Sequence, residues 1–96
     1  MTSFKELINS SPVVLIDFHA DWCAPCKTLS PILEDLKRKR GDDLKLVKID
    51  IDKNPSLSQM LNVRSVPTIL LYKEGQLKWR RSGVVPLSSL EGVPDK

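Results

Sequence analysis

The sequence predicts an α/β fold in which a mixed four-stranded sheet is flanked by helices. Two observations carry this prediction. Short, nearly continuous apolar runs of strand length alternate with segments whose apolar residues recur at helical spacing. Near the end, two strand-like runs flank the turn sequence Lys73-Glu74-Gly75-Gln76, which adds an antiparallel hairpin to the earlier alternation. At 96 residues the chain has the length of one domain, residues 1–96.

The first elements are a short helix and a buried strand. Ser3 and Glu6 have the spacing of a capping box, which predicts that a helix begins here. The polar sequence and proline of residues 9–12 end it. Residues 13–18 are apolar except for Asp17, a pattern typical of a strand buried on both faces.

A second helix follows the cysteines and packs one apolar face inward. Its apolar residues at positions i, i+3, i+4 and i+7 are Leu29, Ile32, Leu33 and Leu36. Four basic residues at 37–40 suit the negative end of the helix dipole, and Gly41 suits the position just past the helix.

The next two elements are a strand and a helix. Residues 44–51 predict a second buried strand. Asn54 and Pro55 then form a helix start, with Pro55 in the first turn. We expect the inward face of this helix to carry Leu57, Met60 and Leu61.

The last elements are a hairpin and a short helix. Residues 67–72 predict a third strand, and residues 77–81 alternate apolar and basic side chains, as a half-exposed edge strand does. After residue 86, Leu87 and Leu90 support one or two turns of helix at most.

Composition excludes several classes of protein. A hydrophobic share of 41% excludes a disordered chain. The longest apolar runs have four residues, whereas a membrane-spanning helix needs about 20. The net charge of +3 is too weak to demand a nucleic-acid partner, and the basic stretches 37–40 and 78–81 fit a helix end and an edge strand. Because the first residues lack a secretory signal, we expect a cytoplasmic protein.

Cys23 and Cys26, the two cysteines of the chain, form a C-x-x-C pair where a strand gives way to a helix. A free thiol with a pKa of about 8.5 is only about 3% thiolate at pH 7, but a helix N-terminus favours the anion. This indicates Cys23 as the attacking nucleophile of disulfide exchange and Cys26 as the resolving thiol. The alternatives are half of a metal site, with His19 as the chain's single histidine, and an inert disulfide.

The residues around this pair resemble the active site of the thioredoxin family, and the resemblance extends over roughly residues 3–85. It implies the thioredoxin fold and dithiol–disulfide exchange on protein disulfides. The stretches that carry it are Asp17-Phe18-His19-Ala20-Asp21-Trp22-Cys23-Ala24-Pro25-Cys26-Lys27, Pro31, Asp50-Ile51-Asp52, Asn54-Pro55, Val66-Pro67-Thr68 and Gly75.

The resemblance also implies roles for residues outside the dithiol. Asp17, whose burial in an apolar strand should raise its pKa, would help to deprotonate Cys26, and Lys48 would tune it. Pro67 would be cis and would face the dithiol. An apolar surface for substrate proteins would surround Cys23, formed by Trp22, Ala24, Pro25, Val66, Pro67, Gly83 and Val84.

The chain departs from the family pattern in four places. Ala24 replaces the usual glycine between the cysteines and should alter the redox poise. His19 stands where many thioredoxins have tryptophan, and we consider either a pairing with Asp52 that modulates Cys23 or a ring without a catalytic part. We also expect the fold to lack the amino-terminal strand of the family and to have a shortened last helix.

Several functions are compatible with these residues. The first is a thioredoxin-type protein-disulfide reductase, an electron carrier in cell redox homeostasis that is reduced by a thioredoxin reductase, either a flavoprotein using NADPH or a ferredoxin-dependent enzyme. Others are an adaptor or holdase of the same fold, a glutathione-dependent enzyme, and a disulfide oxidase or isomerase. We expect a monomer with no bound cofactor, no metal, no nucleic acid and no membrane partner.

Overall fold

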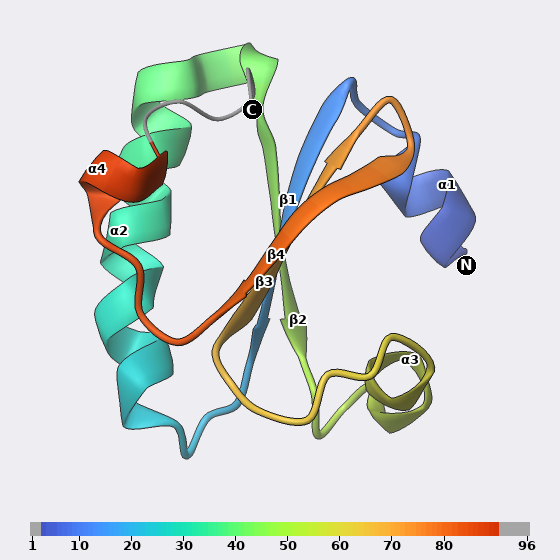
Figure 1. Cartoon of the computed structure of the whole chain (residues 1–96), viewed down its shortest axis with the longest axis vertical. Helices are drawn as coiled ribbons and strands as arrows, with labels where there is room; N and C mark the ends of the chain where they lie inside the picture. The colour runs from blue at the N-terminus through green and yellow to red at the C-terminus, as the bar shows by residue number, and fades with distance from the viewer. Residues whose placement is uncertain (1–2, 91–96) are drawn as a thin grey trace.

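A four-stranded mixed sheet in the order β2-β1-β3-β4 forms the centre of the molecule (Figure 1). The central strand β1 (Val13–His19) pairs in parallel with β2 (Lys45–Asp50) and antiparallel with β3 (Thr68–Lys73). The hairpin strand β4 (Gln76–Ser82) pairs antiparallel with β3. This computed structural model describes residues 3–90. It confirms the predicted mixed sheet and the edge position of the hairpin's second strand.

Helices cover both faces of the sheet. The long helix α2 (Ala24–Arg40), followed by the 3₁₀ turn η1 (Gly41–Asp43), and the short helix α4 (Leu87–Leu90) lie on one face. Helices α1 (Phe4–Ile8) and α3 (Pro55–Met60) lie on the other face, as Figure 1 shows. Up to residue 90, where the described chain ends, the last helix has the short length predicted, and in the described chain α1 is the element that precedes β1.

The alternation of side chains along β1 divides the core into two layers. Val13 and Leu15 pack against α2 and α4, whereas Val14, Ile16 and Phe18 pack against α1 and α3. All five side chains are at least 96% buried. By the same alternation, the residue at position 17 faces the α2 layer.

Two local predictions are wrong. Strand β2 is an edge strand rather than a buried one, and Ile49 alone among its residues is buried, because β1 covers one side of it only. Met60 is 65% exposed rather than inward-facing, because Leu57 on α3 and Leu61 directly after it make the contacts with the core. By contrast, the capping of α1 is confirmed, with the Glu6 amide donating to Ser3 Oγ at 3.1 Å.

The start of α2 lies at the carboxyl end of β1, and the loop that leads into β3 lies at the same end of the sheet (Figure 1). Segments far apart in the sequence therefore meet there. In the part of the chain described, no helix has the length and apolar character needed to cross a membrane.

Candidate active site

Cys23 and Cys26 are joined in a disulfide at the first turn of α2, with their Cα atoms 5.3 Å apart. Cys23 is the N-cap of the helix, and the Cys26 amide donates to its Sγ at 3.1 Å. Each cysteine is 4% exposed. After reduction, the same amide and the positive end of the helix dipole face the Cys23 sulfur, and both stabilise a thiolate there.

The two cysteines pack into a small apolar cluster of their own. Its buried members are the cysteines and Ala20, and the partly buried Ile51 and Val66 pack against them. The cluster brings together the end of β1, the start of α2, and the loops after β2 and before β3. Val66 thus lies against the dithiol although it is 40 residues further along the chain.

Asp17 is the buried acid that the sequence predicts. Its side chain is on β1 with 1% exposure, and its Oδ1 has no hydrogen-bond partner. Burial raises the pKa of the Asp17 carboxyl above its ordinary value of 3.8, and the charges of His19 and Lys48 oppose this rise. An unpaired carboxyl in such a place is held more easily in its neutral form.

A cavity of about 450 Å³ connects Asp17 with the second cysteine. Cys26 lines this cavity, whereas Cys23 is not among its lining residues. The cavity has room for water molecules, which can relay a proton between a carboxyl and a thiol. The remaining lining residues are His19, Ala20, Asp21, Lys27, Ser30 and Lys48.

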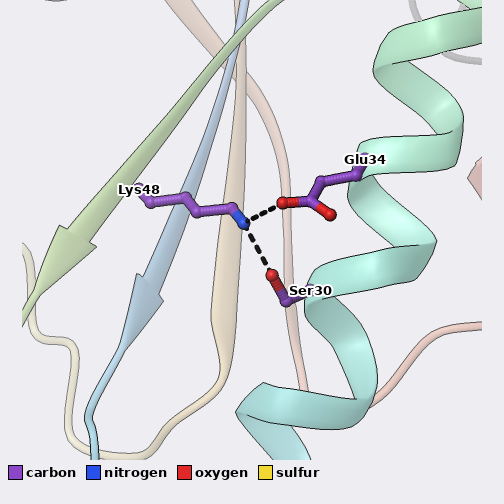
Figure 2. Close-up of polar contacts among 3 residues, drawn as sticks. All are labelled: Ser30, Glu34 and Lys48. Carbon is purple, nitrogen blue, oxygen red and sulfur yellow. Dashed lines mark hydrogen bonds and ion pairs between the residues drawn. The ribbon is translucent and has the colours of Figure 1, made fainter.

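Lys48 lies directly opposite Asp17 in the pairing of β1 with β2, but its ammonium group turns to α2. It donates to Ser30 Oγ at 2.6 Å and to Glu34 Oε1 at 2.9 Å, as Figure 2 shows. The bond from Lys48 to Glu34 and the charge of that lysine lower the pKa of Glu34 below its ordinary value. The sequence-based interpretation placed Lys48 near the acid correctly, but it missed Ser30 and Glu34.

The peptide bond between Val66 and Pro67 is cis, as the resemblance implied. Pro67 is buried, and its carbonyl accepts a hydrogen bond from the Gly83 amide at 2.9 Å. Gly83 has a φ of +87°, which a residue with a side chain rarely adopts. This bond ties the loop after β4 to the segment beside the dithiol.

The predicted rim of the dithiol is apolar and only in part exposed, because Pro67 is buried and Val66 and Gly83 are partly buried. Trp22 is 69% exposed and Val84 43% exposed, and Ala24 and Pro25 are also exposed. The Trp22 indole donates to Asp52 Oδ2 at 2.8 Å, which fixes one edge of the ring. The tryptophan is therefore held at the surface instead of in the core.

His19 has different neighbours from those expected. Asp52 accepts from Trp22, and the acids whose side chains approach His19 are Asp21 and Asp50. Their possible ligand atoms and those of His19 all lie within 4.8 Å of one another, so these three residues could hold a cation. Exposed carboxylates often gather without an ion, and nothing else in the described chain points to a ligand there.

Fold and site together define a class of protein. A dithiol at the start of a helix, with a buried carboxyl that lines the same cavity as the second cysteine, is the arrangement of a thiol–disulfide oxidoreductase. One exchange with a substrate disulfide uses the two sulfurs and a proton acceptor, and the site contains two sulfurs and a carboxyl.

Comparison with known proteins identifies the family. The thioredoxin family model matches residues 1–94. Thioredoxin 1 of Synechococcus elongatus is 37% identical over 92 residues, which cover 96% of this chain and 86% of that protein. The thioredoxin of Bacillus subtilis is 42% identical over 88 residues, which cover 92% of this chain and 85% of that one.

Solved structures agree with the sequence comparison. Oxidised mitochondrial thioredoxin 3 of Saccharomyces cerevisiae superposes with a TM-score of 0.86 at 35% identity, covering 97% of this chain and 87% of that one. The chain belongs to the thioredoxin family, and it is a protein-disulfide reductase that works by dithiol–disulfide exchange.

Proposed function

We propose that Cys23 attacks the substrate disulfide and that Cys26 resolves the mixed disulfide. The Cys23 thiolate bonds to one substrate sulfur, and the other leaves as a thiolate. The Cys26 thiolate then bonds to Cys23 Sγ and releases the first substrate sulfur. Two electrons pass to the substrate, and the protein ends with the Cys23–Cys26 disulfide, the form of the structure.

The observation that carries these roles is the unequal surroundings of the two sulfurs. Cys23 caps the helix and accepts a hydrogen bond from the Cys26 amide, so its thiolate is stabilised without a base. Cys26 lines the cavity that also holds Asp17, so a proton acceptor is available for it. The first sulfur is therefore suited to attack, and the second to be deprotonated on demand.

Asp17 acts in this proposal as the base for the Cys26 thiol. Burial raises the pKa of the Asp17 carboxyl, so it is a stronger base than an exposed carboxyl. Its unpartnered Oδ1 is free to receive the proton, directly or through water in the cavity. Lys48 and His19 tune this step, because the charge of each favours the Asp17 carboxylate.

Substrate proteins dock on the apolar surface around Cys23. Its exposed members can contact an extended segment without demanding one sequence, and backbone groups near Val66 can pair with that segment. The Gly83–Pro67 bond keeps the last loop beside the others. The proposed surface consists of Trp22, Ala24, Pro25, Val66, Pro67, Gly83 and Val84.

The wider setting follows from this activity. Residues 1–96 act as one domain and one monomer, which a thioredoxin reductase supplies with electrons. Both cysteines of the chain belong to the dithiol, and reduced thiols persist best in a reducing compartment, which supports a place in the cytoplasm.

The test is dithiothreitol-driven reduction of a model protein disulfide by the wild type, Cys23→Ser and Cys26→Ser. We expect turnover to be lost in both variants. Only Cys26→Ser should trap a covalent adduct with the substrate, visible on a non-reducing gel and cleaved by excess reductant. An adduct trapped by Cys23→Ser instead would reverse the two roles, and no turnover by the folded wild type would refute the proposal.

A further inference from the structure

Lys48, Ser30 and Glu34 form a polar clasp between strand β2 and helix α2 (Figure 2). The clasp borders the cavity beneath the dithiol, because Ser30 and Lys48 both line it. Glu34 is exposed at its outer side and forms an ion pair with the lysine. The proposed base and the resolving thiol thus share their cavity with the clasp.

The clasp decides where one positive charge lies relative to Asp17. Lys48 is the register partner of Asp17 on the neighbouring strand, and a lysine side chain has a long, flexible stem. Its ammonium is nevertheless engaged by Ser30 and Glu34, while Asp17 Oδ1 has no partner. A lysine released from α2 has the reach to approach the unpaired carboxyl and favour its charged form.

The helix presents the clasp residues on the same strip as the resolving cysteine. Cys26, Ser30 and Glu34 are spaced four residues apart, so they follow one another along the face of α2 that looks toward β2. The first two line the cavity, and the third holds the lysine from its edge. The two partners that hold the lysine therefore come from the helix that carries the thiol.

Charged and titratable groups reach the surroundings of Asp17 from three elements. His19 comes from β1, Lys48 from β2, and Cys26 and Lys27 from α2, while Asp21 lies in the turn between β1 and α2. On the remaining side, β3 places the apolar Ile69 in register with Asp17. Among these groups, Lys48 is the one that both opposes the neutral form of Asp17 and is held by a counter-ion.

We propose that Glu34 and Ser30 are positioning residues for disulfide reduction, which hold the Lys48 ammonium on α2 and so keep Asp17 a good base for Cys26. The inference rests on the proposed role of Asp17. It predicts that freeing the lysine weakens the base and slows the resolving step. Neither residue touches the reacting sulfurs.

The test compares Glu34→Gln, Ser30→Ala and a control, Asp35→Asn. Asp35 is the neighbouring acid on α2 and pairs with Arg38, outside the clasp. In Glu34→Gln we expect the protonation constant of Asp17, followed by carbon NMR of the oxidised protein, to fall by about threefold, where tenfold equals one pH unit. Turnover at pH 7 should fall with it, and Ser30→Ala should act in the same direction. Asp35→Asn should change neither quantity.

Repeating Glu34→Gln in a protein that already carries Lys48→Met separates the effect of the clasp from a direct effect of the Glu34 charge on Asp17. Both effects favour the Asp17 carboxylate in Glu34→Gln, but only the direct one survives in Lys48→Met. We expect Glu34→Gln to change the Asp17 titration much less in that background. An equal change in both backgrounds, or none in either, would overturn the proposal.

Asp17→Asn distinguishes a failure of the proposed base from a failure of the clasp. If Asp17→Asn turns over as fast as the wild type, the proposed role of Asp17 fails and the clasp has nothing to position. If Asp17→Asn is slow while Glu34→Gln behaves like Asp35→Asn, the base stands and the clasp alone is wrong.

Discussion

The two ends of helix α2 have opposite surroundings. At its start lie a disulfide, a cavity of about 450 Å³ and a buried carboxyl oxygen without a partner. At its end, Leu33 and Leu36 are fully packed against Leu44, and Lys37 donates to the carbonyls of Gly41 and Leu44. One end keeps a buried carboxyl oxygen unsatisfied beside the redox disulfide, at a cost in stability, and the other end is packed and hydrogen-bonded.

The largest effect on stability should come from the packed end. Leu36→Ala removes a side chain that is 1% exposed and leaves a cavity among the leucines around it. We expect a loss of about 2–5 kcal/mol in the free energy of unfolding, measured with urea on the oxidised protein. Turnover per folded molecule should stay close to that of the wild type, because the dithiol lies at the other end.

Leu77→Ala is the matched control for this change. The same atoms are removed from a leucine that is 50% exposed on β4, so we expect a change within about 0.5 kcal/mol. An equal loss in both variants would show that the packed end holds no special share of the stability, and the comparison between the ends of α2 would fail.

Replacing the buried carboxyl beside the start of α2 should raise the free energy of unfolding, whereas Leu36→Ala lowers it. Asp17→Asn removes a carboxyl whose pKa the fold raises, so the variant should be more stable than the wild type above that pKa. Below the ordinary value of 3.8 the carboxyl is neutral both folded and unfolded, and its charging costs nothing there. The cost appears as the pH rises from 3.8 through the raised pKa and is complete above it.

Urea unfolding of the oxidised wild type and Asp17→Asn at pH 4 and pH 7 checks this sign. We expect a gain of about 1–3 kcal/mol at pH 7, the scale of a buried unsatisfied group, and a much smaller gain at pH 4. Turnover should fall by at least about tenfold, because the resolving thiol loses its base. A variant that is destabilised at pH 7 would show that the carboxylate has a favourable partner in the folded protein.

The positions of the buried acid and the two cysteines were predictable because all three lie close together in the sequence. Asp17, Cys23 and Cys26 lie on a buried strand and the helix start that follows it, and local patterns place them correctly. Burial of the acid and the position of Cys23 at the helix N-terminus are confirmed. The cis bond before Pro67 is also confirmed, but the resemblance carried it, since local sequence favours the trans form.

What sequence patterns missed depends on contacts between distant elements. An apolar run does not tell which strand has neighbours on both sides, so β2 was expected to be buried although it lies at the edge. The partners of Lys48 and Trp22 depend on how α2 and the loop after β2 lie against the sheet. The spacing of Cys26, Ser30 and Glu34 was a usable signal for the clasp, but only once the facing strand was known.

The smallest effects are expected for two lysine contacts of α2, one that closes its end and one that lies beside the cavity. Lys37 donates at 2.6 Å to Gly41 O and at 2.5 Å to Leu44 O, closing the end of the helix against β2. Lys37→Met keeps most of the apolar stem and removes both bonds, so we expect a loss of about 1 kcal/mol in the free energy of unfolding. Its turnover should not change.

Glu34→Gln alters the lysine contact beside the cavity, and it should change turnover without changing stability. Glu34 is exposed, and exposed ion pairs contribute little to stability, so urea unfolding should show no measurable change. Its effect should appear in turnover and in the titration of Asp17. A lysine contact at the packed end thus supports the fold, whereas one beside the cavity sets the charge around the base. If Glu34→Gln lost stability and kept its turnover, the Lys48–Glu34 contact would be structural like that of Lys37, and the proposed difference between them would be wrong.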